Sequence, residues 1–263
     1  MNIQKVGEFS FTGNLKVCDN PVQVKEAVSE LQDKEISVKV DISKEGMEAL
    51  RQKVQEMPGH FDFEKEMKFR EILPKLQMDP TGDWYEKMRD EWQLRLDEIK
   101  EYNGSYNLED MICETMKSYA KQYHALMQGH ADGSRDIYVS DNIEEYHKVG
   151  LQEDLGYLDK AFERSASSVV TYAGMQEQKW IFRHLFYGEP ALDVELPKDY
   201  RDKIKEVMIK AQEEFHKLYE SGDFTSEKDL ITKAGTIASQ VLREDKEFFD
   251  KMERLFKPLD WAE

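Results

Sequence analysis

Apolar residues recur every three or four positions over most of this chain, which is the spacing of one face of an α-helix. Glycines and prolines interrupt the long runs, because both residues favour helix ends. Five long helices are predicted: Asp83 to the Asn103-Gly104 pair, Asn107 to Gly129, Leu151 to Gly188, Ile204 to Gly222, and Leu230 to Leu255 before Pro258.

Two stretches depart from this helical spacing. Apolar and polar residues alternate from Ile36 to Ile42, which predicts a β-strand with one buried face. Between Gly129 and Gly150 the helical period disappears, and a turn at Asp132-Gly133 leads into the β-rich run at 137–139. We therefore expect a short β-hairpin or extended arm near residues 130–140.

The first eighty residues combine short elements of both kinds. Asn20-Pro21 opens a short helix, and Ser43 can cap a second helix that follows the predicted strand. A helix over 61–78 is interrupted by Pro74, and Asp79-Pro80-Thr81-Gly82 has the composition of a turn. The predicted fold is mainly α, with a small α/β N-terminal part at residues 1–80 and a multi-helix body at residues 81–263.

Composition supports a folded protein with a strongly acidic surface. Hydrophobic residues make up 40% of the chain and aromatic residues 11%, which is enough for a sizeable core. Asp and Glu outnumber Lys and Arg by 54 to 37, for a net charge of −17. Because phosphate backbones and anionic lipids are bound through clustered cations, direct binding of nucleic acid or membrane is not expected. Solubility is the simplest reason for the charge.

The sequence predicts a cytoplasmic location. The N-terminus has no apolar run of signal-peptide length, and no segment approaches the ~20 apolar residues of a transmembrane helix. Cys18 and Cys113 belong to no paired motif, which is typical of a reducing compartment. The sequence is compatible with a disulfide between these two cysteines and with two free thiols.

Metal and cofactor motifs are weak. Glu144 and His147 form a Glu-x-x-His pair, as do Glu213 and His216, and such pairs bind metals in di-iron bundles. With 6 His and 54 acids in 263 residues, however, about one such pair is expected from composition alone. We also find no glycine-rich phosphate loop and no nucleophile elbow. No metal or cofactor is predicted.

The densest polar cluster outside a regular helix is the candidate functional segment. It contains His130, Asp132, Arg135, Asp136 and Tyr138. Loops often present functional groups, and His with Asp can act in acid-base chemistry or bind a metal. The more ordinary interpretation is that Asp132 belongs to hairpin chemistry and that Arg135 forms a local salt bridge.

A Met-rich and aromatic stripe runs along the middle helices. Such a surface could form a groove for a partner helix, because Met side chains adapt to varied ligands. At helical spacing the stripe is more often part of the core, which is the interpretation favoured here. Its members are Trp84, Met88, Trp92, Met111, Met116, Tyr119 and Tyr123.

Three segments carry a resemblance to known sequences. They are Val38 to Gly46, Gly129 to Val139, and Leu155 to Phe162. In this order they resemble an uncharacterised protein family of Firmicutes, found in clostridia and gut anaerobes. Since no activity is assigned to that family, the resemblance implies a lineage and no mechanism.

Three hypotheses of function follow. The leading one is a non-enzymatic protein that binds another protein, because amphipathic helices are abundant and no catalytic set is complete; a homo-oligomer is compatible with this. The second is a metal-dependent hydrolase or other enzyme using His130, Asp132 and Asp136 together with His124 or His184. The third is an acidic mimic of nucleic acid, which requires a continuous exposed stripe of carboxylates.

Overall fold

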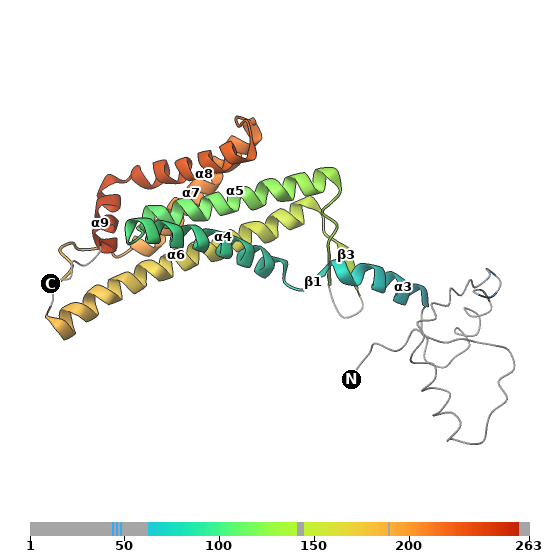
Figure 1. Ribbon diagram of the computed structural model, residues 1–263, viewed down its shortest axis with the longest axis horizontal. Coiled ribbons are helices and arrows are strands. Elements are labelled where there is room, and N and C mark those ends of the chain that lie inside the picture. Colours follow the sequence, from blue (N-terminus) through green and yellow to red (C-terminus); the bar gives the residue numbers. More distant parts are fainter. Residues whose placement is uncertain are drawn as a thin grey trace, which may run out of the picture. The chain divides into compact units, whose positions relative to one another are not determined.

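The computed structural model describes residues 44, 46, 48, 63–140, 145–188 and 190–257, and confirms a mainly helical protein (Figure 1). The described residues form seven α-helices and one small mixed sheet. The helices are α3 (Phe63–Ile72), α4 (Pro80–Asn103), α5 (Leu108–Asp132), α6 (Leu151–Tyr187), α7 (Tyr200–Ser221), α8 (Glu227–Arg243) and α9 (Lys246–Phe256). The strands are β1 (Leu76–Gln77), β2 (Tyr138–Ser140) and β3 (Tyr146–Lys148).

Contacts divide the chain into two units, residues 1–66 and 67–263. The strand predicted over 36–42 and the helix predicted after Asn20-Pro21 lie outside the described residues. Of the helix predicted after Ser43, only residues 44, 46 and 48 are described, and they are helical. The boundary predicted at residue 80 therefore stays a prediction.

Pro74 ends the helical run predicted over 61–78. Helix α3 stops at Ile72, and Leu73–Lys75 form a single 3-10 turn before strand β1. Because proline lacks an N–H and clashes with the preceding turn, the helix cannot continue to Met78. The interruption predicted at Pro74 is therefore confirmed.

The turn predicted at residues 79–82 is the beginning of α4. Asp79 is the N-cap, and its Oδ1 accepts a hydrogen bond of 2.9 Å from the Gly82 amide. Pro80 occupies the first helical position, where its missing N–H has no cost. An Asp-Pro pair suits a turn and a helix start equally well, so composition alone chose the wrong one.

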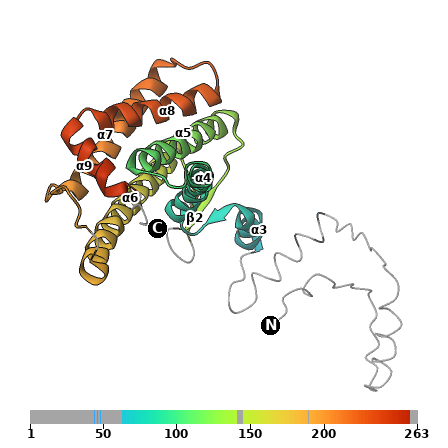
Figure 2. The same cartoon turned by 60° about the vertical axis from the view of Figure 1, so that its left-hand side comes forward.

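Helix α5 is the centre of the helical unit. Figure 2 shows it between α8 and α4, and it also packs against α6 and α7. The predicted cap at Asn107 is confirmed: its side chain accepts from the Asp110 amide while the Asp110 carboxylate accepts from the Asn107 amide. The predicted end at Gly129 is wrong, because α5 continues to Asp132 and ends at Gly133, which has φ +76°.

The hairpin expected near residues 130–140 is confirmed. Strand β2 pairs antiparallel with β3, with Val139 opposite His147. Strand β1 adds to the other edge of β2 in parallel, with Gln77 opposite Val139. A segment from before α4 therefore lies beside one from after α5.

The last predicted helix is two helices. Asp245 separates α8 from α9, and its Oδ1 accepts a hydrogen bond of 3.0 Å from the Phe248 amide. This new start turns α9 so that Phe248, Met252 and Leu255 are buried. The apolar period alone could not reveal the break, because it continues through it.

The Met-rich and aromatic stripe belongs to the core. Trp84, Met88, Met111, Met116 and Tyr119 are all buried, and the two remaining members pack against them. The stripe thus provides no groove. In the part of the chain that the structure describes, no helix combines the length and the apolar character needed to cross a membrane.

Candidate functional site

The candidate segment begins where α5 ends against the following loop. The Arg135 amide donates a 2.8 Å hydrogen bond to the Gly129 carbonyl. A Cβ added at Gly129 would lie 3.0 Å from the Arg135 Cβ, so the loop approaches the helix too closely for a larger residue. Gly129 therefore permits the loop at Arg135 to pack closely against α5. Gly133, in the left-handed conformation, ends the helix.

His130 and Arg135 converge on the carboxylate of Asp154, a fully buried residue in the first turns of α6. The Arg135 guanidinium donates through Nε to Oδ2 at 2.7 Å and through Nη2 to Oδ1 at 3.0 Å. His130 Nε2 lies 3.0 Å from Oδ2, and the indole of Trp84 in α4 donates to Oδ1 at 3.0 Å. We call Trp84, His130, Arg135 and Asp154 the Asp154 cluster.

Burial and hydrogen bonding act in opposite directions on Asp154. Burial alone would raise the pKa of this carboxyl group, because a charge is costly away from water. Hydrogen bonds from Arg135, His130 and Trp84 favour the charged form, and the net effect lowers the pKa. The Arg135 guanidinium also lies 4.6 Å from the centre of the Trp84 ring, where a cation is attracted to the aromatic face.

The other predicted residues have different neighbours. Asp132 is exposed, and its Oδ1 accepts a 2.8 Å hydrogen bond from the Ser134 amide. Asp136 forms ion pairs with Lys75 and with Lys148, the latter at 3.0 Å. These cations hold the pKa of Asp136 below its usual range. Asp136 thus connects the chain before β1 to the end of β3.

Tyr138 lies in β2, opposite Leu76 of β1 and Lys148 of β3. The structure therefore brings His130 and Arg135 together at Asp154 and places Asp136 and Tyr138 at the sheet. Through its hydrogen bonds, the Asp154 cluster holds the end of α5, the start of α6 and one side of α4 together. Its carboxylate already accepts hydrogen bonds at both oxygens.

A second buried polar network lies between α5, α6 and α7. The hydroxyl of Tyr119 donates to Asp159 Oδ1 at 2.6 Å and lies 2.7 Å from His216 Nε2. Gln212 Nε2 donates to the same Asp159 oxygen at 2.8 Å and to the Tyr119 oxygen at 3.0 Å. Burial raises the pKa of Tyr119 and lowers that of His216, so both groups are held neutral near pH 7.

The two histidines of the Glu-x-x-His pairs have separate neighbours in the described residues. His216 contacts Tyr119, and His147 Nε2 lies 3.0 Å from Glu153 Oε1. Glu144 lies outside the described residues. No group of three or more His, Cys, Asp or Glu side chains in the described ranges is arranged to hold a metal ion.

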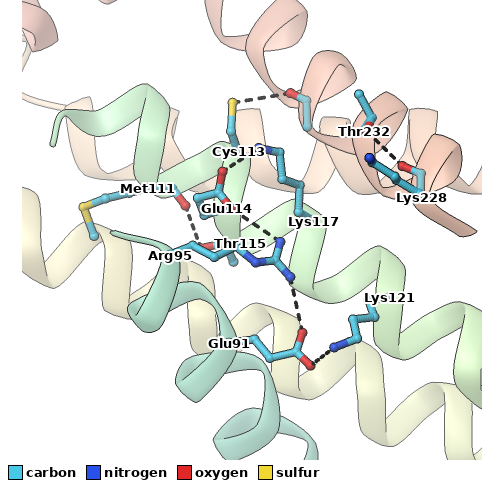
Figure 3. A network of polar contacts seen from close by, with 11 residues as sticks. Glu91, Arg95, Met111, Cys113, Glu114, Thr115, Lys117, Lys121, Lys228 and Thr232 are labelled. Atoms are coloured by element: carbon cyan, nitrogen blue, oxygen red, sulfur yellow. Dashed lines mark hydrogen bonds and ion pairs between the residues drawn. The ribbon is translucent and has the colours of Figure 1, made fainter. Parts of the chain in front are cut away.

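Charged side chains pair across α4 and α5, as Figure 3 shows. Glu91 Oε1 accepts from Lys121 at 2.6 Å, and Glu114 Oε1 accepts from Lys117 at 2.5 Å. Arg95 lies between the two carboxylates, 3.6 Å from Glu91 and 3.4 Å from Glu114. Glu91 and Glu114 therefore each have two cations beside them.

An exposed apolar surface on α6 was missed by the sequence analysis. Phe182 is 50% exposed and Leu185 69% exposed, and the Phe182 and Phe186 rings lie 4.5 Å apart between centres. We call this surface the α6 face. Its large exposed apolar side chains are Met175, Ile181, Phe182, Leu185, Phe186 and Tyr187.

Comparisons with known proteins give no relative: no family model, no curated protein and no solved structure matches this chain.

Proposed function

We propose that this protein works in the cytoplasm as a non-enzymatic module that binds another protein through the α6 face. The observation that carries the proposal is the concentration of exposed apolar side chains on the last four turns of one helix. Among the twelve most exposed large apolar side chains in the described residues, six lie between Met175 and Tyr187. Clusters of exposed apolar side chains are typical of interaction sites.

The enzyme hypothesis has less support from the geometry. An acid-base group must reach a substrate, but His130 is hydrogen bonded to the buried Asp154. Asp132 and Asp136 have other partners, namely Ser134 and the two lysines at the sheet. His124 Nδ1 lies 3.2 Å from the hydroxyl of Tyr219, apart from this segment.

The nucleic-acid mimic also has less support. A mimic needs carboxylates in a continuous exposed row, while Glu91 of α4 and Glu114 of α5 have lysine and arginine partners. Interleaved charges of both signs weaken the local negative potential, although the whole chain remains acidic.

Affinity purification of the full chain from its source cells tests the proposal. Three forms are compared: the unchanged chain, Phe182→Asp, and Ile209→Asp as a matched control. Ile209 lies on α7 and is 47% exposed, close to the value for Phe182. We expect a partner that co-purifies with the unchanged chain and with the control and is lost with Phe182→Asp. Recovery of the same proteins with all three forms would contradict the proposal.

A further inference from the structure

The C-terminal half of α6 is apolar on two opposite sides. Trp180 points toward α9, where its indole donates a 2.9 Å hydrogen bond to the Leu255 carbonyl. Successive residues of an α-helix are rotated by about 100°, so Phe182 projects roughly 200° away from Trp180. The bundle covers the first side, and the second carries Met175, Phe182 and Leu185 in the open. An amphipathic helix of a monomer normally has a polar outer side.

The spacing on the outer side is that of a helix-pairing seam. Met175 and Phe182 are seven residues apart, as are Gln178 and Leu185. Positions repeated in this way meet the corresponding positions of a second helix, whose side chains insert between them. From Thr171 to Phe186 the seam covers 15 helical steps, or about 22 Å.

A groove continues this seam toward α7. It has a volume of about 370 Å³, and Thr171, Gly174, Met175 and Gln178 line its α6 side. Arg201, in the first turn of α7, forms the opposite wall, with Nη2 3.1 Å from where a Cβ on Gly174 would lie. A partner helix that follows α6 as far as Thr171 would therefore lie beside Arg201 of α7 at this end of the seam.

The charges beside the seam are positive. Lys179 and Arg201 lie on its two sides, and Lys179 is exposed. The 178–188 stretch contains no acid, in a chain of net charge −17. Glu177, just before this stretch, accepts a 2.8 Å hydrogen bond from the Tyr200 hydroxyl and lies 3.5 Å from Arg201. Charge complementarity therefore favours carboxylates at the edges of the partner helix.

We infer that the partner presents one amphipathic helix, with an apolar seam and carboxylates at its edges, and that this helix lies along α6 from Thr171 to Phe186. The inference rests on the proposed function. A second copy of this chain suits the face less well. Antiparallel pairing about the middle of the seam would bring the two Lys179 ammonium groups together.

Two synthetic helical peptides of three heptads test the charge and the seam. Both have Leu and Ile at the a and d positions; one has Glu at every e and g position, and the other has Lys. Like charges at these positions also discourage each peptide from pairing with itself. Fluorescence anisotropy of the labelled peptides is measured as full-length protein is added.

The Glu peptide is expected to bind at least tenfold more tightly than the Lys peptide. Phe182→Asp should weaken binding of the Glu peptide at least tenfold, because it places a charge in the middle of the seam. Ile209→Asp should leave the affinity within twofold. Lys179→Glu should reduce the difference between the two peptides, and circular dichroism checks that each variant is folded.

Other outcomes would overturn the inference in distinguishable ways. If neither peptide binds but the purified partner still depends on Phe182, the proposed function stands and the acidic helix is wrong. If the partner is also independent of Phe182, both fail. Self-association in analytical ultracentrifugation that is lost in Leu185→Glu would assign the face to a second copy. Crosslinks from residue 182 to residues 1–62 or 258–263 of the same chain would assign it to the chain itself.

Discussion

Replacing Asp154 by Asn tests the Asp154 cluster directly. The substitution keeps the size of the side chain but removes its charge and converts one acceptor oxygen into an NH₂ donor. Three donor groups converge on this carboxylate, from Trp84, His130 and Arg135, at 2.7 to 3.0 Å. An amide cannot accept from all of them, so at least one buried donor loses its partner and the guanidinium loses its counter-charge.

The magnitude follows from the burial of the pair. Asp154 is fully buried, and the Arg135 side chain is only 15% exposed. Removing one partner of a buried ion pair costs about 3–5 kcal/mol in free energy of unfolding. For a unit of the size of residues 67–263, each kcal/mol lowers the melting temperature by about 2–4 °C. The expected loss for Asp154→Asn is therefore about 6–20 °C.

Thermal and urea unfolding followed by circular dichroism at pH 7 measure this loss. Asp132→Asn is the control, because this exposed side chain is hydrogen bonded within its own turn, to the Ser134 amide. The unfolding midpoint of this variant should not move measurably. A loss below about 1 kcal/mol for Asp154→Asn would refute the reasoning, because that is the size of a solvent-exposed pair.

The pH dependence gives an independent check of the same cluster. Because the pKa of Asp154 is lowered in the folded protein, its contribution is fully present above the unfolded carboxyl pKa, about 3.9. The contribution disappears as the pH falls through the folded value. The difference in stability between the unchanged chain and Asp154→Asn should thus be constant from pH 7 to about pH 5 and shrink below pH 4. A difference that grows on acidification would contradict the assigned direction.

Three further predictions concern other parts of the helical unit. Tyr119→Phe removes a buried hydroxyl from its network and should lower the urea-unfolding free energy by about 1–3 kcal/mol, so an unchanged midpoint would contradict that network. Burial raises the pKa of the Cys113 thiol to about 12. Iodoacetamide at pH 8 should therefore modify this thiol far more slowly in the folded protein than in urea, as measured by peptide mass spectrometry. Equal rates of modification would refute this prediction. Gly129→Ala should lower the melting temperature of the protein, because the added Cβ meets the loop at Arg135. Gly156→Ala in α6 adds a Cβ that meets nothing within 4 Å, so it should stabilise the protein by up to about 1 kcal/mol. Equal shifts in melting temperature would refute the close approach of the loop to Gly129.

Helix ends that are set by a single glycine were predicted correctly from the sequence. Gly104, Gly188 and Gly222 end helices in the left-handed conformation at the predicted places. Gly129 failed as a predicted end because its role depends on a loop that folds back against it, and that contact is not written in the neighbouring residues. The break between α8 and α9 was not predicted for a similar reason. Both helices are buried on one side, so the apolar period continues across Asp245.

The candidate segment was predicted in part. His130 and Arg135 were selected, but the residue on which they converge was not, because it follows 19 positions after Arg135. A signal for Asp154 was present. Leu151, Leu155 and Leu158 define an apolar face, and Asp154 occupies the remaining position of the same i, i+3, i+4, i+7 pattern. An acid on such a face must be buried with partners, so this position deserved selection from the sequence.

The α6 face had a comparable signal, and it explains why interaction remains the best-supported proposal. Six of the eight residues from 180 to 187 are apolar, and only Arg183 and His184 are polar. A helix of this composition has apolar side chains on more than one side, and each such side needs cover. In the described residues α9 covers the Trp180 side, and Phe182, Leu185 and Phe186 stay exposed. Apolar surface on this scale adds nothing to the stability of the bundle that leaves it in water, and it becomes favourable only when a partner removes it from water.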